Sequence, residues 1–333
     1  MRSLLLVGLV TALVLTACGG GGGRSAESTV RRAALAVTLD WTPNPDHVGL
    51  YYARDSGLDA RAGLNVTIRA PSDPTAPLKL VAAGHSDLAV SYEQEVFFAA
   101  AKKLPVVAVA AVVPQPLNSL MAIEPAIRSV RDLKGHTIGI TGVPSDYATL
   151  DTALHSVGLA RSQVEVVTVG YNLLPALLSH RVDAVLGVYR NVEGIQLALR
   201  GLHPTIIPVD RAGVPTYDEL VLVASRTRLR SDPAYRSAVR RFVGAFLAGT
   251  AAARRHPARS LGIMERVTDS KSAFLRRAVP ATLRLLSGPH GVGCLDVSAW
   301  QRFGRWMESR GLLKRRIAAS SVTDPAFLPS RCR

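Results

Sequence analysis

Short apolar runs alternate with amphipathic segments from residue 33 to residue 224, a pattern typical of layered α/β proteins. Strands are predicted at 35–39, 65–70, 87–91, 106–113, 137–141, 164–169, 184–188 and 220–224. Helices are predicted at 47–56, 77–83, 146–156 and 173–178, and the residues after 224 are expected to be mainly helical. One apolar stripe in that last part has helical spacing, and it consists of Val239, Phe242, Val243, Phe246 and Leu247.

Two segments of the chain repeat the same helix–turn–strand pattern. Residues 80–93 read LVAAGHSDLAVSYE, and residues 177–189 read LLSHRVDAVLGVY. In both, a strand is expected to begin just after an aspartate, Asp87 or Asp183, and to end at a tyrosine. Chance can produce such a recurrence, but two related α/β lobes account for it better. The strand ends of two such lobes would face one cleft, where open α/β sheets bind ligands.

The first residues have the features of an export signal. Arg2 precedes an apolar run over 4–15 that is too short to anchor a mature protein. The run leads into Leu15-Thr16-Ala17-Cys18, which resembles the lipobox of bacterial lipoproteins. We therefore expect a signal peptide over 1–17, a lipidated Cys18 and a glycine-rich linker over 18–32. The mature protein would then sit on the outer face of the bacterial cytoplasmic membrane, although an ordinary signal with an incidental cysteine is the alternative.

The net charge of +15 is concentrated in residues 226–333, which hold 22 Lys/Arg against 6 Asp/Glu. Such an excess can indicate nucleic-acid binding. Only 5% of the residues are aromatic, no nucleic-acid motif is present, and an exported protein meets little nucleic acid. We therefore expect solvated helix faces and no nucleic-acid partner, with attraction to anionic lipid or cell-wall polymer as a secondary effect.

Two further cysteines allow one disulfide. If Cys18 carries lipid, Cys294 and Cys332 remain, and in an exported protein they can form a bond that ties down the C-terminus. Two unpaired thiols are the alternative. Because the cysteine spacing does not suit a zinc site, no metal is expected. Because the protein is expected to leave the cytoplasm, no cofactor is expected either.

Aromatic, carboxylate and amide side chains gather at the expected strand ends of both repeats; Asn118 and Ser119, for example, are expected to end one strand. The faces of Trp and Tyr rings stack on flat heterocycles, and a carboxylate accepts hydrogen bonds from a ring amino group. The sequence therefore predicts a site for a flat, hydrogen-bonding heterocycle. The candidate ligand-binding residues are Asp40, Trp41, Asn44, His47, Tyr92, Glu93, Glu95, Asn118, Ser145, Tyr189, Asn191, Glu193, Tyr217 and Glu219.

Catalytic motifs are not found in the sequence. It contains no G-x-S-x-G, no H-E-x-x-H and no phosphate-binding loop, and its histidines are scattered. Glu93 and Glu95 have the spacing for acid–base work only in principle, because no nucleophile or metal ligand accompanies them. We therefore expect a protein that is not an enzyme.

Residues 40–51, DWTPNPDHVGLY, resemble the opening of the thiamine-pyrimidine substrate-binding proteins of ABC importers. Further matching segments are VSYEQE at 90–95, VGY at 169–171 and YDELVL at 217–222, so the similarity runs from about residue 35 to residue 260. The resemblance implies a two-lobed, hinged periplasmic-binding fold of type II, with a mixed sheet flanked by helices in each lobe and the ligand between the lobes. The expected lobes are 33–119 with 221–333, and 120–220.

The resemblance also implies the function. A monomeric receptor would bind a thiamine precursor such as formylaminopyrimidine or hydroxymethylpyrimidine and deliver it to a membrane permease, with Trp41, Tyr92 and Glu193 or their neighbours lining the cleft. One alternative is a receptor for riboflavin-like solutes, and another is a receptor for sulfonate or nitrate-like anions, which Arg190 keeps open. A third is an exported pyrimidine-modifying enzyme. The superfamily also contains the eukaryotic pyrimidine synthase, but Ser91 and Glu95 stand where that enzyme has its pyridoxal lysine and its sacrificial histidine.

Overall fold

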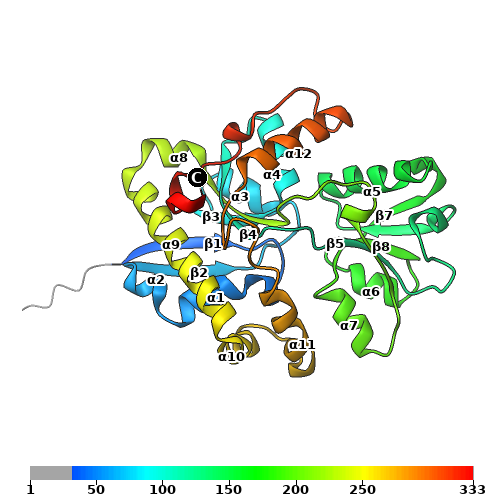
Figure 1. Cartoon of the computed structure of the whole chain (residues 1–333), viewed down its shortest axis with the longest axis horizontal. Coiled ribbons are helices and arrows are strands. Elements are labelled where there is room, and N and C mark those ends of the chain that lie inside the picture. The colour runs from blue at the N-terminus through cyan, green and yellow to red at the C-terminus, as the bar shows by residue number, and fades with distance from the viewer. Residues whose placement is uncertain (1–31, 333) are drawn as a thin grey trace, which may run out of the picture. The chain divides into compact units, whose positions relative to one another are not determined.

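The computed structural model describes residues 32–332, which form two lobes, each built on a five-stranded mixed sheet (Figure 1). The first sheet has the order β2 (Leu64–Arg69), β1 (Ala33–Thr38), β3 (Leu88–Ser91), β10 (Leu220–Ser225) and β4 (Val106–Val113). The second has the order β7 (Glu165–Thr168), β6 (Thr137–Ile140), β8 (Ala184–Tyr189), β5 (Asn118–Ala122) and β9 (Thr205–Pro208). The three strands β2, β1 and β3 are parallel, as are β7, β6 and β8, while β10 and β5 run antiparallel to their neighbours. The two lobes therefore share one topology.

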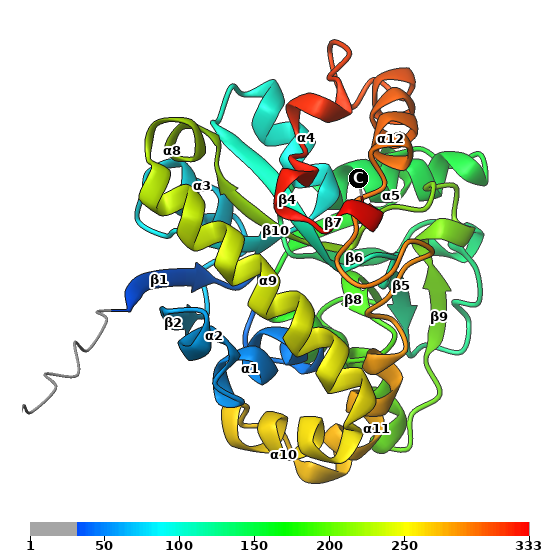
Figure 2. The same ribbon diagram turned by 60° about the vertical axis from the view of Figure 1, so that its left-hand side comes forward.

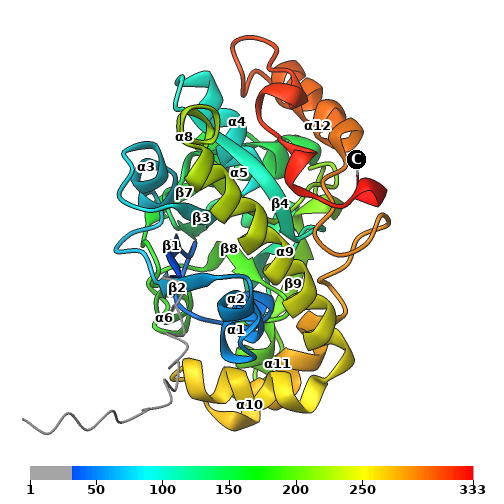
Figure 3. The same cartoon turned by 90° about the vertical axis from the view of Figure 1, so that its left-hand side faces the viewer.

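Helices flank both sheets. Those of the first lobe are α1 (Val48–Asp55), α2 (Leu58–Arg61), α3 (Ala76–Ala82), α4 (Glu93–Ala101), α8 (Arg226–Ser231), α9 (Pro233–Arg255), α10 (Pro257–Val267), α11 (Ser272–Leu283) and α12 (Val297–Ser309). Those of the second lobe are α5 (Pro144–Ser156), α6 (Leu173–Leu178) and α7 (Glu193–Leu199). Figures 2 and 3 show α9 running along the first lobe, and its predicted apolar stripe is buried against that lobe.

The repeat found in the sequence has a matching structural role in each lobe. The Oδ2 atom of Asp87 accepts a hydrogen bond of 2.8 Å from the amide of Ala36, and Oδ2 of Asp183 accepts one of 2.8 Å from the amide of Thr137. Each aspartate thereby fastens the start of one parallel strand to the strand beside it. The turns before these strands pass through the left-handed region, at Gly84 in one and His180 in the other. The two units α3–β3 and α6–β8 are therefore equivalent.

Several elements differ from the sequence-based prediction. The short helices α4 and α7 and the strand β9 were not expected. Asn118 and Ser119 begin β5, so the prediction that they end a strand is wrong. The physical reason lies in Pro114 and Pro116, which cannot donate to a ladder and so separate β4 from β5. Because β5 begins at Asn118, two residues that the sequence assigned to the first lobe stand in the second sheet; the division of residues between the lobes stays a prediction.

Two crossover segments, 114–117 and 212–219, connect the sheets. One carboxylate oxygen, Oε2 of Glu219, accepts hydrogen bonds from the amides of Leu117 and Asn118, at 2.6 and 2.8 Å. The same oxygen accepts a hydrogen bond of 3.0 Å from the hydroxyl of Tyr217. A single buried side chain therefore holds the two crossovers together.

The C-terminal segment is bound to the first lobe. Cys294 and Cys332 form a disulfide bond, and Thr323 lies beside Ala108 of β4 in a parallel bridge. Within residues 32–332 we find no helix with the length and apolar character needed to cross a membrane. The expected signal peptide, Cys18 and nearly all of the linker lie outside the described residues.

Helices α1 and α9 cross closely because glycines stand at their contact. A Cβ atom on Gly249 would lie 2.7 Å from the carbonyl oxygen of Gly49 and 2.8 Å from Cβ of Ala53. Both distances are shorter than van der Waals contact, so the two backbones approach at a separation that only glycine permits at this position.

We expect Gly249→Ala to lower the free energy of unfolding by about 1–3 kcal/mol, because the added methyl group must push the two helices apart. Gly244→Ala is the matched control in the same helix, since its added Cβ would meet nothing within 4 Å among the described residues apart from its chain neighbours and its own helix backbone. That control should raise stability by about 0.5–1 kcal/mol through helix propensity. Urea unfolding followed by circular dichroism measures both, and a Gly249→Ala variant as stable as the parent would contradict the close crossing.

Candidate functional site

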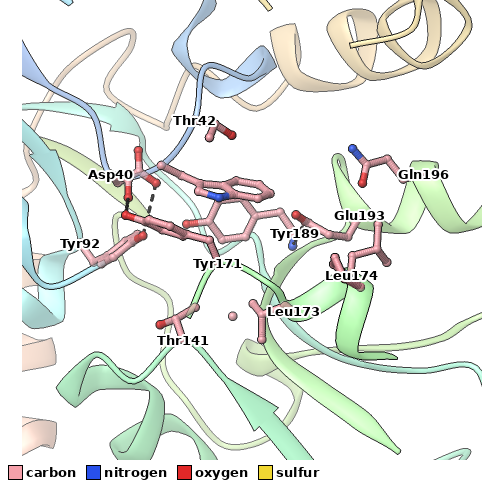
Figure 4. Close-up of a pocket in the computed structure, with 13 residues that line it drawn as sticks. Asp40, Thr42, Tyr92, Thr141, Tyr171, Leu173, Leu174, Tyr189, Glu193 and Gln196 are labelled. Atoms are coloured by element: carbon pink, nitrogen blue, oxygen red, sulfur yellow. Dashed lines mark hydrogen bonds between the residues drawn. The ribbon is translucent and has the colours of Figure 1, made fainter. Parts of the chain in front are cut away.

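A cavity of about 340 Å³ lies between the two lobes (Figure 4). It is lined by Asp40, Trp41, Thr42, Tyr92, Thr141, Tyr171, Leu173, Leu174, Pro175, Gly187, Tyr189, Glu193 and Gln196. The polar and aromatic members follow the carboxyl ends of β1, β3, β6, β7 and β8 or lie at the end of β8. This is the edge at which parallel sheets place their ligand-binding loops.

Asp40 is held by hydrogen bonds at both carboxylate oxygens. Its Oδ1 lies 2.7 Å from Nε2 of His47, and its Oδ2 accepts a hydrogen bond of 3.3 Å from the hydroxyl of Tyr92. The other ring nitrogen of His47, Nδ1, accepts from the amide of Asn44 at 3.3 Å. Because Nδ1 accepts, Nε2 is the nitrogen that carries the proton, and it donates to Asp40. Asn44 therefore fixes His47, and His47 in turn orients Asp40.

Aromatic rings from both lobes face the cavity. The rings of Trp41 and Tyr171 lie 6.3 Å apart with an interplanar angle of 29°. The hydroxyl of Tyr171 donates a hydrogen bond of 2.8 Å to the carbonyl oxygen of Asp40, which joins the second lobe to the first (Figure 4). Tyr92 and Tyr189 add a ring from each lobe. Such walls are suited to stacking on a planar ligand.

Glu193 places a carboxyl group in the cavity wall at the start of α7. Its Oε2 accepts a hydrogen bond of 2.7 Å from the amide of Tyr189, which fixes the side chain. Burial raises the pKa of Glu193 to about 7, although the hydrogen bond from Tyr189 opposes that rise. This carboxyl group can accept hydrogen bonds from amino groups of a bound ring.

A smaller polar chamber of about 20 Å³ adjoins the cavity and shares Tyr92, Thr141, Gly187 and Tyr189 with it. Its remaining walls are Gln94, Asn118, Val143, Ser145, Asp146, Thr149 and Glu219. Asp146 accepts hydrogen bonds from the hydroxyl of Thr141 and the amide of Gly142, and burial raises its pKa to about 7. The chamber has room for a small polar substituent or a water molecule.

Cationic side chains are absent from the lining of both spaces, among the residues that the structure describes. Arg190, the candidate for an anion-binding residue, instead donates to the carbonyl oxygen of Pro116. A ligand phosphate or sulfonate would therefore face carboxyl groups without a cation, and such contacts between like charges are unfavourable.

Eight of the fourteen candidate residues lie in these two spaces. The cavity holds Asp40, Trp41, Tyr92, Tyr189 and Glu193, and the chamber adds Asn118, Ser145 and Glu219. The other six, Asn44, His47, Glu93, Glu95, Asn191 and Tyr217, do not line either space.

Two of these six instead connect the lobes. Oε1 of Glu95 in α4 accepts a hydrogen bond of 2.8 Å from the amide of Ser145 in α5. Asn191 of the second lobe donates to Asp46 at 2.7 Å and to the hydroxyl of Thr282 at 2.8 Å in the first lobe. Both contacts bring the lobes together beside the cavity.

Glu93 and Tyr217 lie at the second crossover. Oε2 of Glu93 accepts a hydrogen bond of 2.7 Å from the amide of Asp218, while Tyr217 donates to Glu219. Sequence position next to a strand end did not distinguish these residues from those that face the cavity.

Tyr171 is the main lining residue absent from the candidate set. It stands in the loop between two elements that the sequence did predict, a strand ending near 168 and a helix beginning at 173. The rule that selected Trp41, an aromatic residue just after a parallel strand, would also have selected Tyr171.

Residues 44–260 match the model of a family described as NMT1/THI5 like. The chain belongs to the NMT1/THI5-like family. Its relatives include the formylaminopyrimidine-binding protein of Halalkalibacterium halodurans. That protein is 33% identical, and the match covers 97% of this chain and 100% of the relative. A Haemophilus influenzae protein named for thiamine biosynthesis is also 33% identical, over 85% of this chain and 89% of its own length.

The periplasmic-binding fold expected from the sequence is confirmed. The alkanesulfonate-binding protein SsuA of Xanthomonas axonopodis pv. citri superposes on this NMT1/THI5-like protein with a TM-score of 0.70 at 19% identity, covering 88% of this chain and 99% of that one. A shorter match, 24% identical over 49% of this chain and 48% of the other, is with a 4-amino-5-hydroxymethyl-2-methylpyrimidine phosphate synthase of Uromyces fabae. Relatives of the chain therefore carry the names of both binding proteins and enzymes.

The buried carboxyl groups of this NMT1/THI5-like protein predict how its stability depends on pH. Burial raises the pKa of Glu193 and Glu219 from 4.5 to about 7, and that of Asp146 from 3.8 to about 7. The folded state therefore holds protons that the unfolded state has already released, so stability falls as pH rises. We expect the melting temperature to decrease between about pH 5 and about pH 7.

Differential scanning calorimetry measures this decrease, and Glu193→Gln should make it smaller because the amide does not titrate. Glu124→Gln, at an exposed position, is the control that should keep the decrease seen in the parent. A melting temperature that rises over the same pH interval would contradict the assignment of buried, proton-holding carboxyl groups.

Proposed function

We propose that this protein is the solute-binding component of an ABC importer, and that its two lobes close on a small, flat, uncharged heterocycle of the thiamine-precursor pyrimidine class. The observation that carries the proposal is the cavity between the lobes, which combines facing aromatic rings with carboxyl groups and has no lysine or arginine in its described lining. A planar ring that is rich in N–H donors satisfies both the aromatic walls and the acceptors.

The two lobes supply complementary contacts for such a ligand. Trp41 and Tyr92 come from the first lobe, and Tyr171, Tyr189 and Glu193 from the second. A ligand that touches both lobes binds the closed state better than the open one, so its binding energy shifts the population toward closure. A permease can then recognise the closed form, which exists mainly when the ligand is bound.

The choice of pyrimidine rests on the relatives and on charge. A relative that is 33% identical is named for binding formylaminopyrimidine. A sulfonate or a phosphate ester would bring a negative charge next to Asp40 and Glu193, and a larger ring system such as a flavin would have to fit a cavity of about 340 Å³. These two properties favour a small uncharged base over the other solutes.

Export and anchoring complete the proposal. The leader over 1–17, cleavage before Cys18 and lipidation of its thiol would place a monomeric receptor at the outer face of the membrane, next to its permease. Mass spectrometry of the mature N-terminus tests this part, and an N-terminus beyond Cys18 would refute the lipid anchor.

Isothermal titration calorimetry and native mass spectrometry with the purified protein test the function. Hydroxymethylpyrimidine or its formylamino analogue should bind at one to one and leave unchanged, whereas hydroxymethylpyrimidine phosphate, riboflavin and an alkanesulfonate should bind much more weakly. Tighter binding of an anion would overturn the ligand class. Chemical conversion of the bound pyrimidine would instead favour the rival function, an exported pyrimidine-modifying enzyme.

We expect Trp41→Ala to weaken pyrimidine binding by more than about tenfold, because it removes the largest ring surface from the cavity. Trp306→Ala is the matched control, since Trp306 lies on α12 outside the cavity lining. Calorimetric titration gives both dissociation constants. An unchanged constant for Trp41→Ala would count against the site.

Glu193→Gln should weaken the binding of an aminopyrimidine by about tenfold, because a carboxylate is a stronger acceptor than an amide. It should weaken the binding of an oxo analogue that lacks the amino donor much less. The comparison of two ligands on one variant separates loss of that hydrogen bond from a general loss of fit. Equal losses for both ligands would refute the role of Glu193 as the acceptor of the ring amino group.

A further inference from the structure

A second cavity, of about 430 Å³, lies against the crossovers and shares no lining residue with the cavity between the lobes. Its walls come from Pro114 of the first crossover, residues 215–218 of the second, and the C-terminal part of the first lobe. We call it the crossover cavity. An occupant would touch both connections between the lobes.

Two carboxyl groups in the crossover cavity have no cationic partner. Glu93 is 1% exposed; its Oε2 accepts from the amide of Asp218, and its Oε1 has no hydrogen-bond partner. Asp218 accepts a hydrogen bond of 2.7 Å from Nε1 of Trp300. Within residues 32–332, no lysine, arginine or histidine forms an ion pair with either group.

The two basic side chains at the rim, His290 and Arg302, are directed to another acid. His290 lies 3.4 Å and Arg302 3.9 Å from Oδ2 of Asp296, and both side chains are more than half exposed. In the absence of a cation, burial and the neighbouring acids raise the pKa of Asp218 to about 7 and that of Glu93 well above its usual range. An unpaired buried acceptor is costly, and a cationic donor placed beside it removes that cost.

Aromatic side chains line the same cavity as these acids. Tyr217, Trp300 and Phe303 all line the cavity, and the rings of Tyr217 and Phe303 lie 5.5 Å apart at an angle of 46°. A planar cation gains from such walls both by stacking and by cation–π attraction.

We propose that the crossover cavity is a second ligand-binding site, which takes a small planar organic cation of the arylamidine or protonated aminoheterocycle class. The N–H groups of the cation bond to the carboxylates of Asp218 and Glu93, and its ring lies against Trp300 and Phe303. The site is separate from the cavity between the lobes and does not depend on the function proposed for that cavity.

Benzamidine, a planar cation, and benzamide, its neutral isostere, are the probes. Calorimetric titration of the purified protein should give a benzamidine dissociation constant on the order of 1 mM, as expected for a ligand of this size. It should show no measurable binding of benzamide. Asp218→Asn should weaken the binding of benzamidine by at least about tenfold, because the amide keeps an acceptor for Trp300 but loses the negative charge.

Two further variants locate the probe. Ala299→Leu adds bulk to the wall of the crossover cavity at the half-exposed start of α12, so it should block benzamidine without disturbing the core, even where Asp218→Asn fails to fold. Trp41→Ala changes only the cavity between the lobes and should leave benzamidine binding as in the parent. The proposal is overturned if benzamide binds as well as benzamidine, or if benzamidine does not bind at all. It is also overturned if benzamidine binds with full affinity to Ala299→Leu or to a folded Asp218→Asn, or if Trp41→Ala loses benzamidine binding.

Discussion

One buried carboxylate oxygen, Oε2 of Glu219, fixes the place where the two lobes meet. By accepting two amides of the first crossover and the hydroxyl of Tyr217 in the second, it holds both chain crossings at one point. Asn118, whose amide it binds, in turn accepts a hydrogen bond of 3.0 Å from the amide of Gly187 in β8. Gly187 lines the cavity and has a φ of 99°, a conformation that suits glycine. The crossovers and the wall of the cavity are therefore connected through three consecutive hydrogen-bonded residues, Glu219, Asn118 and Gly187.

Outside the crossovers, the lobes meet through hydrogen bonds and through side-chain packing, which includes the rings of Trp41 and Tyr171. Tyr171, Asn191 and Glu95 each make a hydrogen bond from one lobe to the other, and each contact lies beside the cavity. Net stabilisation by single hydrogen bonds is modest, because water satisfies the same groups when the lobes part. Closure therefore needs an additional contribution, and a ligand stacked between Trp41 and the rings of the second lobe provides one. A ligand can decide between the open and closed states of a receptor only where the direct contacts between the lobes do not decide the equilibrium alone.

Periodicity and turn residues were sufficient to predict most strands, the α/β layers and the internal repeat, because these depend on local pattern. Asp87 and Asp183 stood out for that reason, and each fastens a strand in its own lobe. The cavity depends instead on which way each side chain points. His47 and Asn191 were candidates together with Asp40 and Tyr189, yet His47 hydrogen-bonds to Asp40 and Asn191 bridges the lobes. The short helices α4 and α7 follow the ends of β3 and β8 and set the direction of Glu93, Glu95 and Glu193, but their length leaves little periodicity to detect.

The fold is shared with receptors of anionic solutes, so ligand choice depends on the side chains. In this chain the acid of the first lobe, Asp40, has both oxygens occupied by His47 and Tyr92. The acids of the second lobe, Glu193 and Asp146, have hydrogen-bond donors but no cation, and their raised pKa values reflect that environment. An anionic ligand would force these groups to remain protonated or to face a like charge. A neutral base with N–H groups satisfies them in either protonation state, because a carboxylate and a carboxylic acid both present an acceptor oxygen. The arrangement of acids in this cavity is therefore unfavourable for an anionic solute, although the fold is shared with an alkanesulfonate-binding protein.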